Sequence, residues 1–373
     1  MKKRLRSSLL LLSFTFFFYQ ANAAVGDTTR IRVHDKVDIT WFGNYDQMGF
    51  FPDGSTQYSK ILMHYTMGCA STGCSDWDYT TKIEARIRTG QYDSNVASID
   101  TISQAPLEID TTWNVFEIME PFELGRVITP YGGYMATGTQ GFDNDWEHTY
   151  TFDVTDFVTL LKDSIEIRAH YSGWSSGFSV TLDFDFIEGT PYRDVQSIQN
   201  LWRGSWGYSD GPTFNSTHLL PVDVDLSPNA INSKLRITPS GHGFDNNVNC
   251  AEFCIRDYTV DINGAHVFTQ AMWRDDCGLN PIYPQGGTWI YDRANWCPGG
   301  KAWAYEHELT SYVTPGSTVN FDMDIEEYTW TGNQAPSYII DAQLVTYGSP
   351  NFTHDAAILC LLYTSDAADD DVR

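Results

Sequence analysis

Short stretches in which apolar and polar residues alternate recur along most of this 373-residue chain. Residues 164–171 (SIEIRAHY) and 180–187 (VTLDFDFI) show the pattern, and clusters of Gly, Pro, Asn and Asp separate such stretches. A period of two is typical of antiparallel strands with one buried face, and it predicts that the acids of 180–187 face outward. Further strands are predicted at 60–67, 81–88, 217–224, 233–238, 257–262, 318–323 and 337–346. Residues 153–161 hold the clearest helical turn, which Asp153 or Thr155 could cap.

The strand pattern predicts an all-β chain with two domains. A Gly-Thr-Pro sequence at 189–191 ends the first series of strands, and a polar stretch follows to about Asn200. The segments on either side of this break are each long enough to own a core. We therefore expect two jelly-roll (β-sandwich) domains at residues 24–191 and 192–348, with a linker at 349–359.

Both ends of the chain differ from the rest. A basic start, an apolar run at 9–18 and an Ala-Asn-Ala sequence predict a signal peptide over 1–23, and therefore a secreted, periplasmic or cell-surface protein. The run is too short for a membrane span, and no later stretch approaches spanning length. Residues 360–373 resemble a translated sequencing adapter more than protein, and we leave them out of the fold prediction.

Six of the seven cysteines remain once Cys360 is set aside, an even number that favours disulfides in an exported chain. Their spacing suggests three local pairs, Cys69–Cys74, Cys250–Cys254 and Cys277–Cys297. A zinc site of four thiolates is the weaker alternative, because the tight pairs lack the spacing of zinc knuckles. The nine histidines form no metal-binding motif, and no nucleophile elbow or phosphate-binding glycine loop occurs. We expect no metal and no cofactor.

The composition of the chain limits the classes of molecule that it is expected to bind. The net charge of −25 makes nucleic acid a poor partner, although an acidic surface can also serve solubility alone. Aromatic residues make up 14% of the chain, which fits both β-rich cores and surfaces that stack against sugars. Composition alone does not separate these two uses.

Two acids stand beside cysteines in tight loops. Asp78 follows Cys74 and precedes a predicted strand, at the rim where β scaffolds carry functional side chains. Glu252 lies between Cys250 and Cys254, so a disulfide there would hold its carboxylate rigid, as acid–base or electrostatic catalysis requires. Arg293 could orient such an acid pair. The alternative is a solvated turn carboxylate at Asp78 and a stapled loop with an exposed Glu252.

Five motifs, in chain order, resemble the peptide-N-glycosidase F family. They are CSDWD at 74–78, GRVITPY at 125–131, DFIEGTP at 185–191, CAEFC at 250–254 and DRANWCPG at 292–299. The resemblance runs from about residue 34 to 347. It implies two side-by-side jelly rolls with an active-site cleft at their interface. It also implies metal-free hydrolysis of the amide between an N-linked glycan and asparagine, on glycoproteins or glycopeptides, by a monomer.

The resemblance also assigns roles to individual residues. Asp78 matches the principal catalytic carboxylate, Glu252 a second essential acid and Arg293 an active-site arginine. Trp77, Trp174 and Trp296 match tryptophans that line the cleft, and the three cysteine pairs match the family's disulfides.

This chain departs from the family at five positions in the same region. Ser172 stands in place of a third acid, and Tyr79 in place of an arginine. Gly132 and Phe253 replace cleft tryptophans, and His242 replaces another aromatic residue. Substrate contacts are therefore expected from Trp77, Tyr79, Ser172, Trp174, His242, Phe253 and Trp296.

Three other functions compete with the amidase. A glycan-binding module without chemistry is suggested by Ser172, and a scaffold domain of a longer surface protein by the chain's end. Copper monooxygenases share the two-jelly-roll fold, but the absence of histidine motifs argues against their chemistry.

Overall fold

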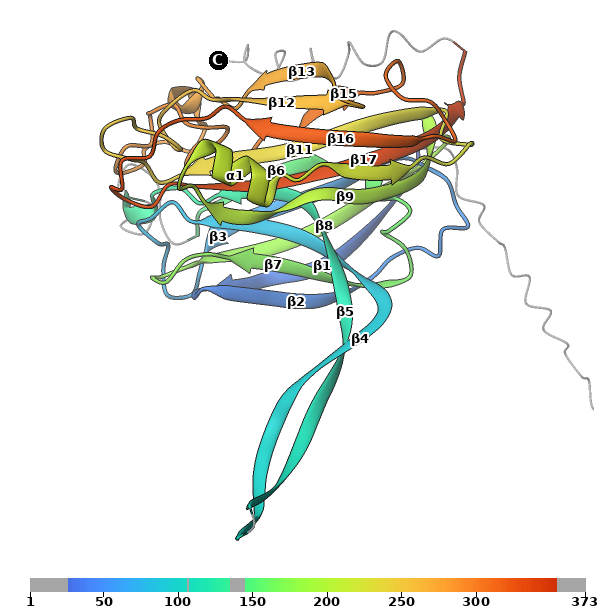
Figure 1. Ribbon diagram of the computed structural model, residues 1–373. Coiled ribbons are helices and arrows are strands. Elements are labelled where there is room, and N and C mark those ends of the chain that lie inside the picture. The colour runs from blue at the N-terminus through green and yellow to red at the C-terminus, as the bar shows by residue number, and fades with distance from the viewer. Residues whose placement is uncertain (1–25, 106, 135–144, 354–373) are drawn as a thin grey trace, which may run out of the picture.

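The computed structural model describes residues 26–105, 107–134 and 145–353, so the predicted signal peptide and residues 360–373 lie outside the described part. Strands dominate the structure (Figure 1). The first half contains β1 (Thr28–Ile39), β2 (Gly43–Phe50), β3 (Tyr58–Cys69), β4 (Thr80–Gln104), β5 (Leu107–Ile128), β6 (Glu147–Asp153), β7 (Ser164–Tyr171) and β8 (Phe178–Glu188). The second half contains β9 (Arg193–Gly207), α1 (Gly211–His218), β10 (Val222–Asp225), β11 (Asn232–His242), β12 (Asp257–Ile262), β13 (Ala265–Ala271), β14 (Gly300–Lys301), β15 (Tyr305–Glu308), β16 (Thr318–Ile325) and β17 (Ser337–Pro350). Short 3-10 helices lie at Gly132–Tyr134, Thr155–Phe157 and Cys277–Leu279.

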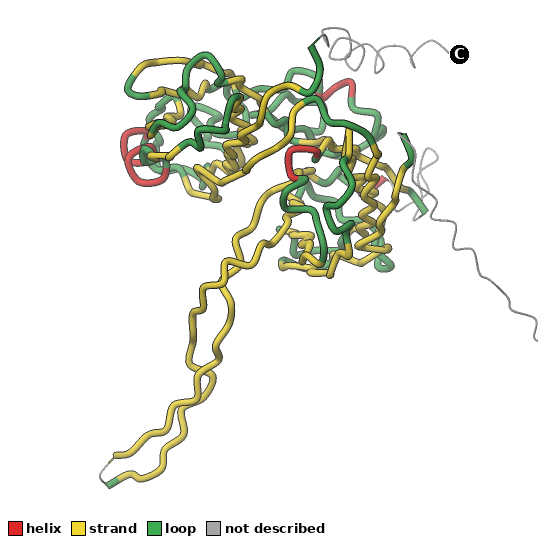
Figure 2. Tube along the Cα trace, turned by 90° about the vertical axis from the view of Figure 1, so that its right-hand side faces the viewer, coloured by secondary structure: helices red, strands yellow, loops and turns green. Residues whose placement is uncertain are grey.

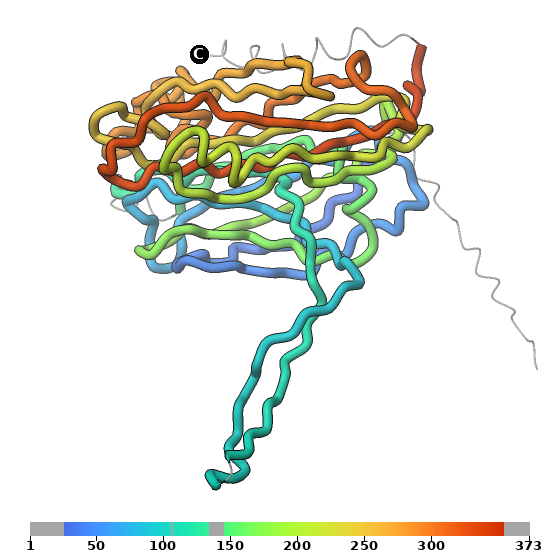
Figure 3. The backbone as a smooth tube through the Cα atoms, in the orientation of Figure 1, coloured from blue at the N-terminus to red at the C-terminus, as the bar shows by residue number. Residues whose placement is uncertain are grey.

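The strands form two pairs of sheets. One pair has the orders β1-β8-β3-β6 and β14-β5-β4-β7-β2, and the other has β10-β16-β12-β13 and β15-β11-β17-β9. The second pair lies above the first in Figure 1, and the chain can be followed from one to the other in Figure 3. Strand β14 comes from the second half but pairs with β5, where Gly300 faces Ile128. The all-β prediction is confirmed, and the arrangement is that of two jelly rolls.

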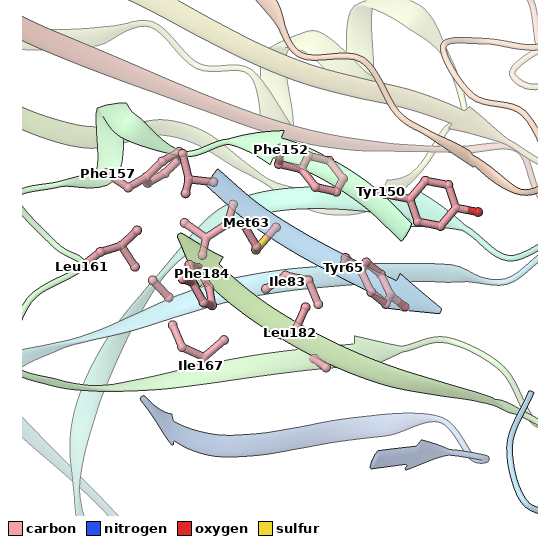
Figure 4. Packing of buried hydrophobic residues seen from close by; sticks show 14 of the residues in the cluster. Met63, Tyr65, Ile83, Tyr150, Phe152, Phe157, Leu161, Ile167, Leu182 and Phe184 are labelled. Atoms are coloured by element: carbon pink, nitrogen blue, oxygen red, sulfur yellow. The ribbon is translucent and has the colours of Figure 1, made fainter. Parts of the chain in front are cut away.

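Each pair of sheets encloses its own core. In β3, Ile61, Met63 and Tyr65 are buried at every second position, as the period-two pattern predicts. They meet Phe184 and other residues of the first core (Figure 4). The second core contains Leu235 of β11 and its neighbours from β12, β16 and β17.

A buried arginine fixes one pair of sheets against the other. Arg126 of β5 has no solvent exposure and donates to Glu123 Oε2 at 2.8 Å within its own strand. It also donates to Ser240 Oγ at 2.7 Å on β11 and to the Ile339 carbonyl at 3.0 Å on β17. Because a buried guanidinium is costly unless it is paired, these bonds specify one relative position of the two halves.

Strands β4 and β5 continue beyond the sheet as a two-stranded arm (Figure 2). The pairing register shifts between Arg88 and Tyr92, and Gly90 has a φ of 71°. An irregularity of this kind bends a ribbon and increases its twist. The arm therefore leaves the body at this point.

Several expectations from the sequence require correction. The predicted strand at 217–224 is α1 over its first two residues, and β10 begins only at Val222; Phe214 of α1 packs against Tyr208 and Tyr338. The polar stretch from 192 to 200 is the start of β9, whose polar residues pair with β17, as in Ser197 with Thr346.

The acids of β8 do not simply face solvent. Asp183 and Asp185 are each 8% exposed, because Arg32 and Arg30 of β1 cover them with paired hydrogen bonds. The helical turn predicted at 153–161 is a 3-10 helix followed by turns. Asp153 Oδ1 accepts from the Thr155 N–H at 3.0 Å just ahead of it.

All three predicted disulfides are present: Cys69–Cys74, Cys250–Cys254 and Cys277–Cys297. None of the helices within the described residues has the length and apolar character needed to cross a membrane.

Candidate active site

Asp78 lies in a segment that is held at both sides. The Cys69–Cys74 disulfide closes the loop ahead of it, and β4 begins two residues after it. Thr129, just past the end of β5, accepts from the Tyr79 N–H at 2.7 Å and donates to the Trp77 carbonyl at 2.8 Å. The backbone on both sides of Asp78 is therefore fixed to the neighbouring strand.

The carboxyl of Asp78 is half-buried and accepts a hydrogen bond from the Tyr131 hydroxyl at 2.8 Å. Burial raises the pKa of Asp78, while the Tyr131 hydrogen bond and the Arg293 charge oppose the rise. Tyr131 is itself placed by Gln285, whose side-chain oxygen accepts from the Tyr131 N–H at 3.1 Å. A carboxylate with a raised pKa, held by one hydrogen bond, is suited to accept a proton.

Glu252 lies in the loop closed by Cys250–Cys254 and is bonded on both carboxyl oxygens. Oε1 accepts from Arg293 Nε at 3.0 Å, and Oε2 accepts from the Gly243 N–H at 3.0 Å. Burial raises the pKa of Glu252 to about 7; the Arg293 charge opposes this rise and the Asp78 charge adds to it. Because the Asp78 charge acts on Glu252, the two carboxyls lie near each other.

Arg293 is fully buried and has a partner for every guanidinium nitrogen. Besides Glu252, it donates to the Tyr291 carbonyl, and to the Thr288 carbonyl at 3.0 Å and Thr288 Oγ1 at 2.9 Å. Its guanidinium lies 4.9 Å from the ring centres of both Phe253 and Trp296. Flanking rings and a full set of acceptors fix a planar cation in one orientation.

One hydrogen-bonded path joins the two acids. Tyr131, which donates to Asp78, has its hydroxyl 3.5 Å from Thr288 Oγ1, and Thr288 accepts from Arg293, which donates to Glu252. Asp78 and Tyr131 flank β4 and β5 in the first half, whereas the other three residues come from the second half. The path therefore crosses between the two jelly rolls.

Trp296 and His242 form an aromatic stack next to Arg293. Trp296 is only 2% exposed and donates to the Gly241 carbonyl at 2.6 Å, so in this structure it supports Arg293 from below and does not line a surface. His242 stacks on it with ring centres 5.1 Å apart and shares a 2.7 Å hydrogen bond with Ser240. Burial, with the charges of Arg126 and Arg293, lowers the pKa of His242 to about 3, so its ring is neutral.

Two tryptophans expected at the cleft are exposed. Trp77 is 59% exposed and Trp174 is 62% exposed. Trp174 stacks on Phe42, with ring centres 5.9 Å apart and planes 22° from parallel. Phe42 is itself 53% exposed, so the pair presents a continuous aromatic surface.

The remaining expected contacts are less open. Tyr79 packs edge-on against Tyr171, with its hydroxyl 3.2 Å from Ser175 Oγ. Ser172 Oγ accepts from the Thr80 N–H at 2.9 Å, so its oxygen is engaged by backbone. Phe253 is half-buried above Arg293.

A side chain at Gly132 would collide with Ser75, since its Cβ would lie 2.3 Å from the Ser75 carbonyl oxygen.

Sequence reasoning named the acids and the arginine but not Tyr131 and Thr288, which join them, or Phe42, which stacks on Trp174. Tyr131 ends the GRVITPY motif, so its position in that motif could have singled it out. Thr288 and Phe42 lie in stretches without any distinguishing pattern. Within the residues that the structure describes, no group of three or more His, Cys, Asp or Glu side chains is placed to hold a metal ion.

Known proteins resemble this chain in sequence. Residues 211–345 match the sequence model of a family described as peptide-N-glycosidase F, C terminal. The chain is 27% identical over 331 residues to peptide-N(4)-(N-acetyl-beta-D-glucosaminyl)asparagine amidase F of Elizabethkingia miricola, covering 85% of this chain and 83% of that protein.

Solved structures extend the match to three dimensions. A crystal structure of peptide-N(4)-(N-acetyl-beta-D-glucosaminyl)asparagine amidase superimposes with a TM-score of 0.67 at 25% identity, covering 87% of this chain and 97% of that one. The structure of PNGF-II shares the fold, with a TM-score of 0.65 at 17% identity, covering 88% of this chain and 66% of that one. Fold and site together define a protein of two jelly rolls with a candidate acid–arginine site between them. Within that class, the resemblance to the peptide-N-glycosidase F family is confirmed.

Proposed function

We propose that this chain hydrolyses the amide bond between an N-linked glycan and the asparagine that carries it. The observation that carries the proposal is the pair of carboxyls with raised pKa, Asp78 and Glu252, joined by a hydrogen-bonded path that includes the buried Arg293. Perturbed carboxyls on a rigid frame at a domain interface are typical of catalytic sites. The similar protein named as an amidase acting on N-acetylglucosaminyl-asparagine supports the same substrate class here.

Asp78 is the base or the nucleophile in this proposal. As a base, it takes a proton from water while the water oxygen bonds to the carbonyl carbon of the asparagine side chain. The carbon–nitrogen bond then breaks, and the proton passes to the departing nitrogen, which leaves aspartate and a glycosylamine. In the direct route the Asp78 carboxylate bonds to that carbon, and the carbon–nitrogen bond breaks as the nitrogen takes a proton from water. The hydroxide that remains then cleaves the resulting anhydride, which gives aspartate and regenerates Asp78. Tyr131 holds the carboxyl of Asp78 in place through Oδ2 in either route.

Glu252 and Arg293 supply orientation and charge. The two hydrogen bonds to Glu252 come from N–H donors, which favour its ionised form. Ionised Glu252 then holds Arg293 in place, and the positive charge of Arg293 stabilises charge that develops on the amide. Because Arg293 has no exposed surface, it acts through Glu252 and through its field.

The exposed aromatic surface suits the glycan side of the substrate. Trp77, Trp174 and Phe42 offer flat faces on which sugar rings can stack their C–H groups. Tyr79, Ser172, His242 and Phe253 are assigned to the wall beneath. We expect the substrates to be N-glycosylated proteins or glycopeptides outside the cytoplasm, in line with the disulfides. We also expect no metal requirement, so a chelator should leave the rate unchanged.

The test is incubation of a denatured N-glycoprotein with the mature chain. The proposal expects free glycan, together with aspartate in place of the glycosylated asparagine in the peptide. The Asp78→Asn variant should release nothing, and Asp76→Asn, which removes an exposed acid two residues away, should keep full activity. Full release by Asp78→Asn would overturn the assignment of Asp78.

A glycan-binding module without chemistry is the second candidate, and Ser172 favours it. Its hydroxyl is engaged by the Thr80 N–H at a position where the family resemblance implies an acid. Binding on a glycan array by the wild-type chain, with no release at any pH, would favour this function over hydrolysis. Failure to bind any glycan would exclude it.

A further inference from the structure

The arm formed by β4 and β5 beyond residue 88 has one apolar face. Residues directly opposite each other in an antiparallel pair share a face, and successive residues alternate. The pairs Val96–Trp113, Ser94–Val115 and Thr101–Ile109 fall on one side, together with Tyr92 and Ile99. Leu107, which pairs with Gln104, lies on this side too. We define the arm face as the seven apolar side chains on this side: Tyr92, Val96, Ile99, Leu107, Ile109, Trp113 and Val115.

The opposite side of the arm is polar and acidic. The pairs Asn95–Asn114, Asp100–Asp110 and Ser103–Glu108 lie there. Asp93 and Phe116 also pair on this side. Glu117, at the base, is the acid on the arm-face side, and it accepts from the Gly90 N–H at 3.1 Å. The arm is therefore an amphipathic ribbon whose apolar side carries no charge beyond its base.

The arm face is open to solvent within the described residues. Its side chains range from 46% exposed at Val96 to 72% at Leu107, and Trp113 is 56% exposed. A single two-stranded ribbon is marginal in water and needs further strands or a packed face. A contiguous apolar surface of this kind marks an interaction site.

We propose that the arm face packs against the arm face of a second copy of this chain. The partner must present an uncharged apolar strip of matching length and twist, and a second arm presents such a strip. Two arms face to face would bury on the order of 1,200 Å², which reaches the range of specific protein interfaces. In such a dimer the acids of the opposite side would stay in water. This is important because each copy has a net charge of −25, and burying like charges between two copies is costly.

The position of the arm is compatible with this contact. Asp78 precedes the start of β4 at Thr80, whereas the arm follows Arg88 at the other end of the same sheet. The arm points away from both jelly rolls (Figures 1 and 2). Pairing through the arms therefore leaves the candidate active site open, and the dimer replaces the monomer that the sequence resemblance implies.

The test compares two neighbouring residues that lie on opposite sides of the arm. Sedimentation equilibrium of the mature chain should give twice the chain mass. Val96→Asp, which places an acid in the arm face, should raise the dissociation constant at least tenfold. Asn95→Asp adds the same charge on the polar side and should leave the mass unchanged. Because neither residue packs on the body, the melting temperature of both variants should match the wild type.

The dependence of the dimer's dissociation constant on salt concentration is an independent test of the proposal. Screening of the like charges on the two copies should tighten the dimer as ionic strength rises. A wild-type chain that stays monomeric at all protein and salt concentrations would overturn the proposal, as would equal effects of the two variants. A monomer that floats with phosphatidylcholine vesicles, and loses this property in Val96→Asp, would also overturn it and assign the arm face to lipid.

Discussion

Arg293 donates its Nε–H to Glu252 across 3.0 Å from a side chain that solvent does not reach. Arg293→Lys keeps the charge but loses the planar fork, so the Thr288 and Tyr291 acceptors are left without their donors. We expect a loss of about 3 kcal/mol in the free energy of unfolding. Urea denaturation measures it.

The control for this change is Arg256→Lys. Arg256 pairs with Glu326 at 2.8 Å, and the Glu326 side chain is 51% exposed. Such partly exposed pairs contribute less than ~1 kcal/mol. Equal losses at the two arginines would contradict the structural role given to Arg293.

The raised pKa of Glu252 predicts that the free energy of unfolding depends on pH. A free glutamate ionises near 4.5, but in the folded chain the pKa of Glu252 is raised to about 7. Between these values the folded state binds more protons than the unfolded state, so the free energy of unfolding falls as pH rises through this window. Glu252→Gln should remove that part of the slope, as measured by melting temperature against pH. The same change at the exposed Glu327 should leave the slope as in the wild type.

The same group predicts the opposite trend for activity. In the proposed function Glu252 acts as a carboxylate, so the rate of glycan release should rise as pH increases through about 7. A rate that falls across that pH would show that the protonated form acts. In Glu252→Gln the residual rate should lack this rise.

The hydrogen bond from Tyr131 to Asp78 predicts that Tyr131 positions the Asp78 carboxyl for the reaction. Tyr131→Phe removes the hydrogen bond that favours ionised Asp78, so the pKa of Asp78 should rise further. We expect kcat to fall by roughly 10- to 100-fold, with the largest loss at low pH. Tyr283→Phe, at an exposed tyrosine of the same region, is the control. A uniform loss at every pH would indicate a merely structural role.

The sequence predicted those parts of the fold that depend on local patterns. Strands β7 and β12 begin and end at the predicted residues, because each has one buried face and a turn at both ends. The three cysteine pairs followed from spacing alone. These features need no knowledge of distant contacts.

The sequence-based predictions were wrong or incomplete where contacts between residues far apart in the chain determine the structure. Residues from 193 read as polar because β9 uses them on its exposed side, beside β17. The arm was missed because its apolar side chains are exposed within the described residues, so they do not mark a strand that packs on a core. At the site, Asp78, Glu252 and Arg293 could be named from motifs. The path through Tyr131 and Thr288 could not, since it exists only when the two jelly rolls meet.

Mass spectrometry of the peptide product tests the central claim most directly. A denatured N-glycoprotein is incubated with the mature chain, with Asp78→Asn and with Asp76→Asn. The account predicts glycan release with conversion of the glycosylated asparagine to aspartate by the wild type and Asp76→Asn, and an unchanged substrate with Asp78→Asn. Release that leaves asparagine in the peptide, or equal conversion by Asp78→Asn, would contradict it.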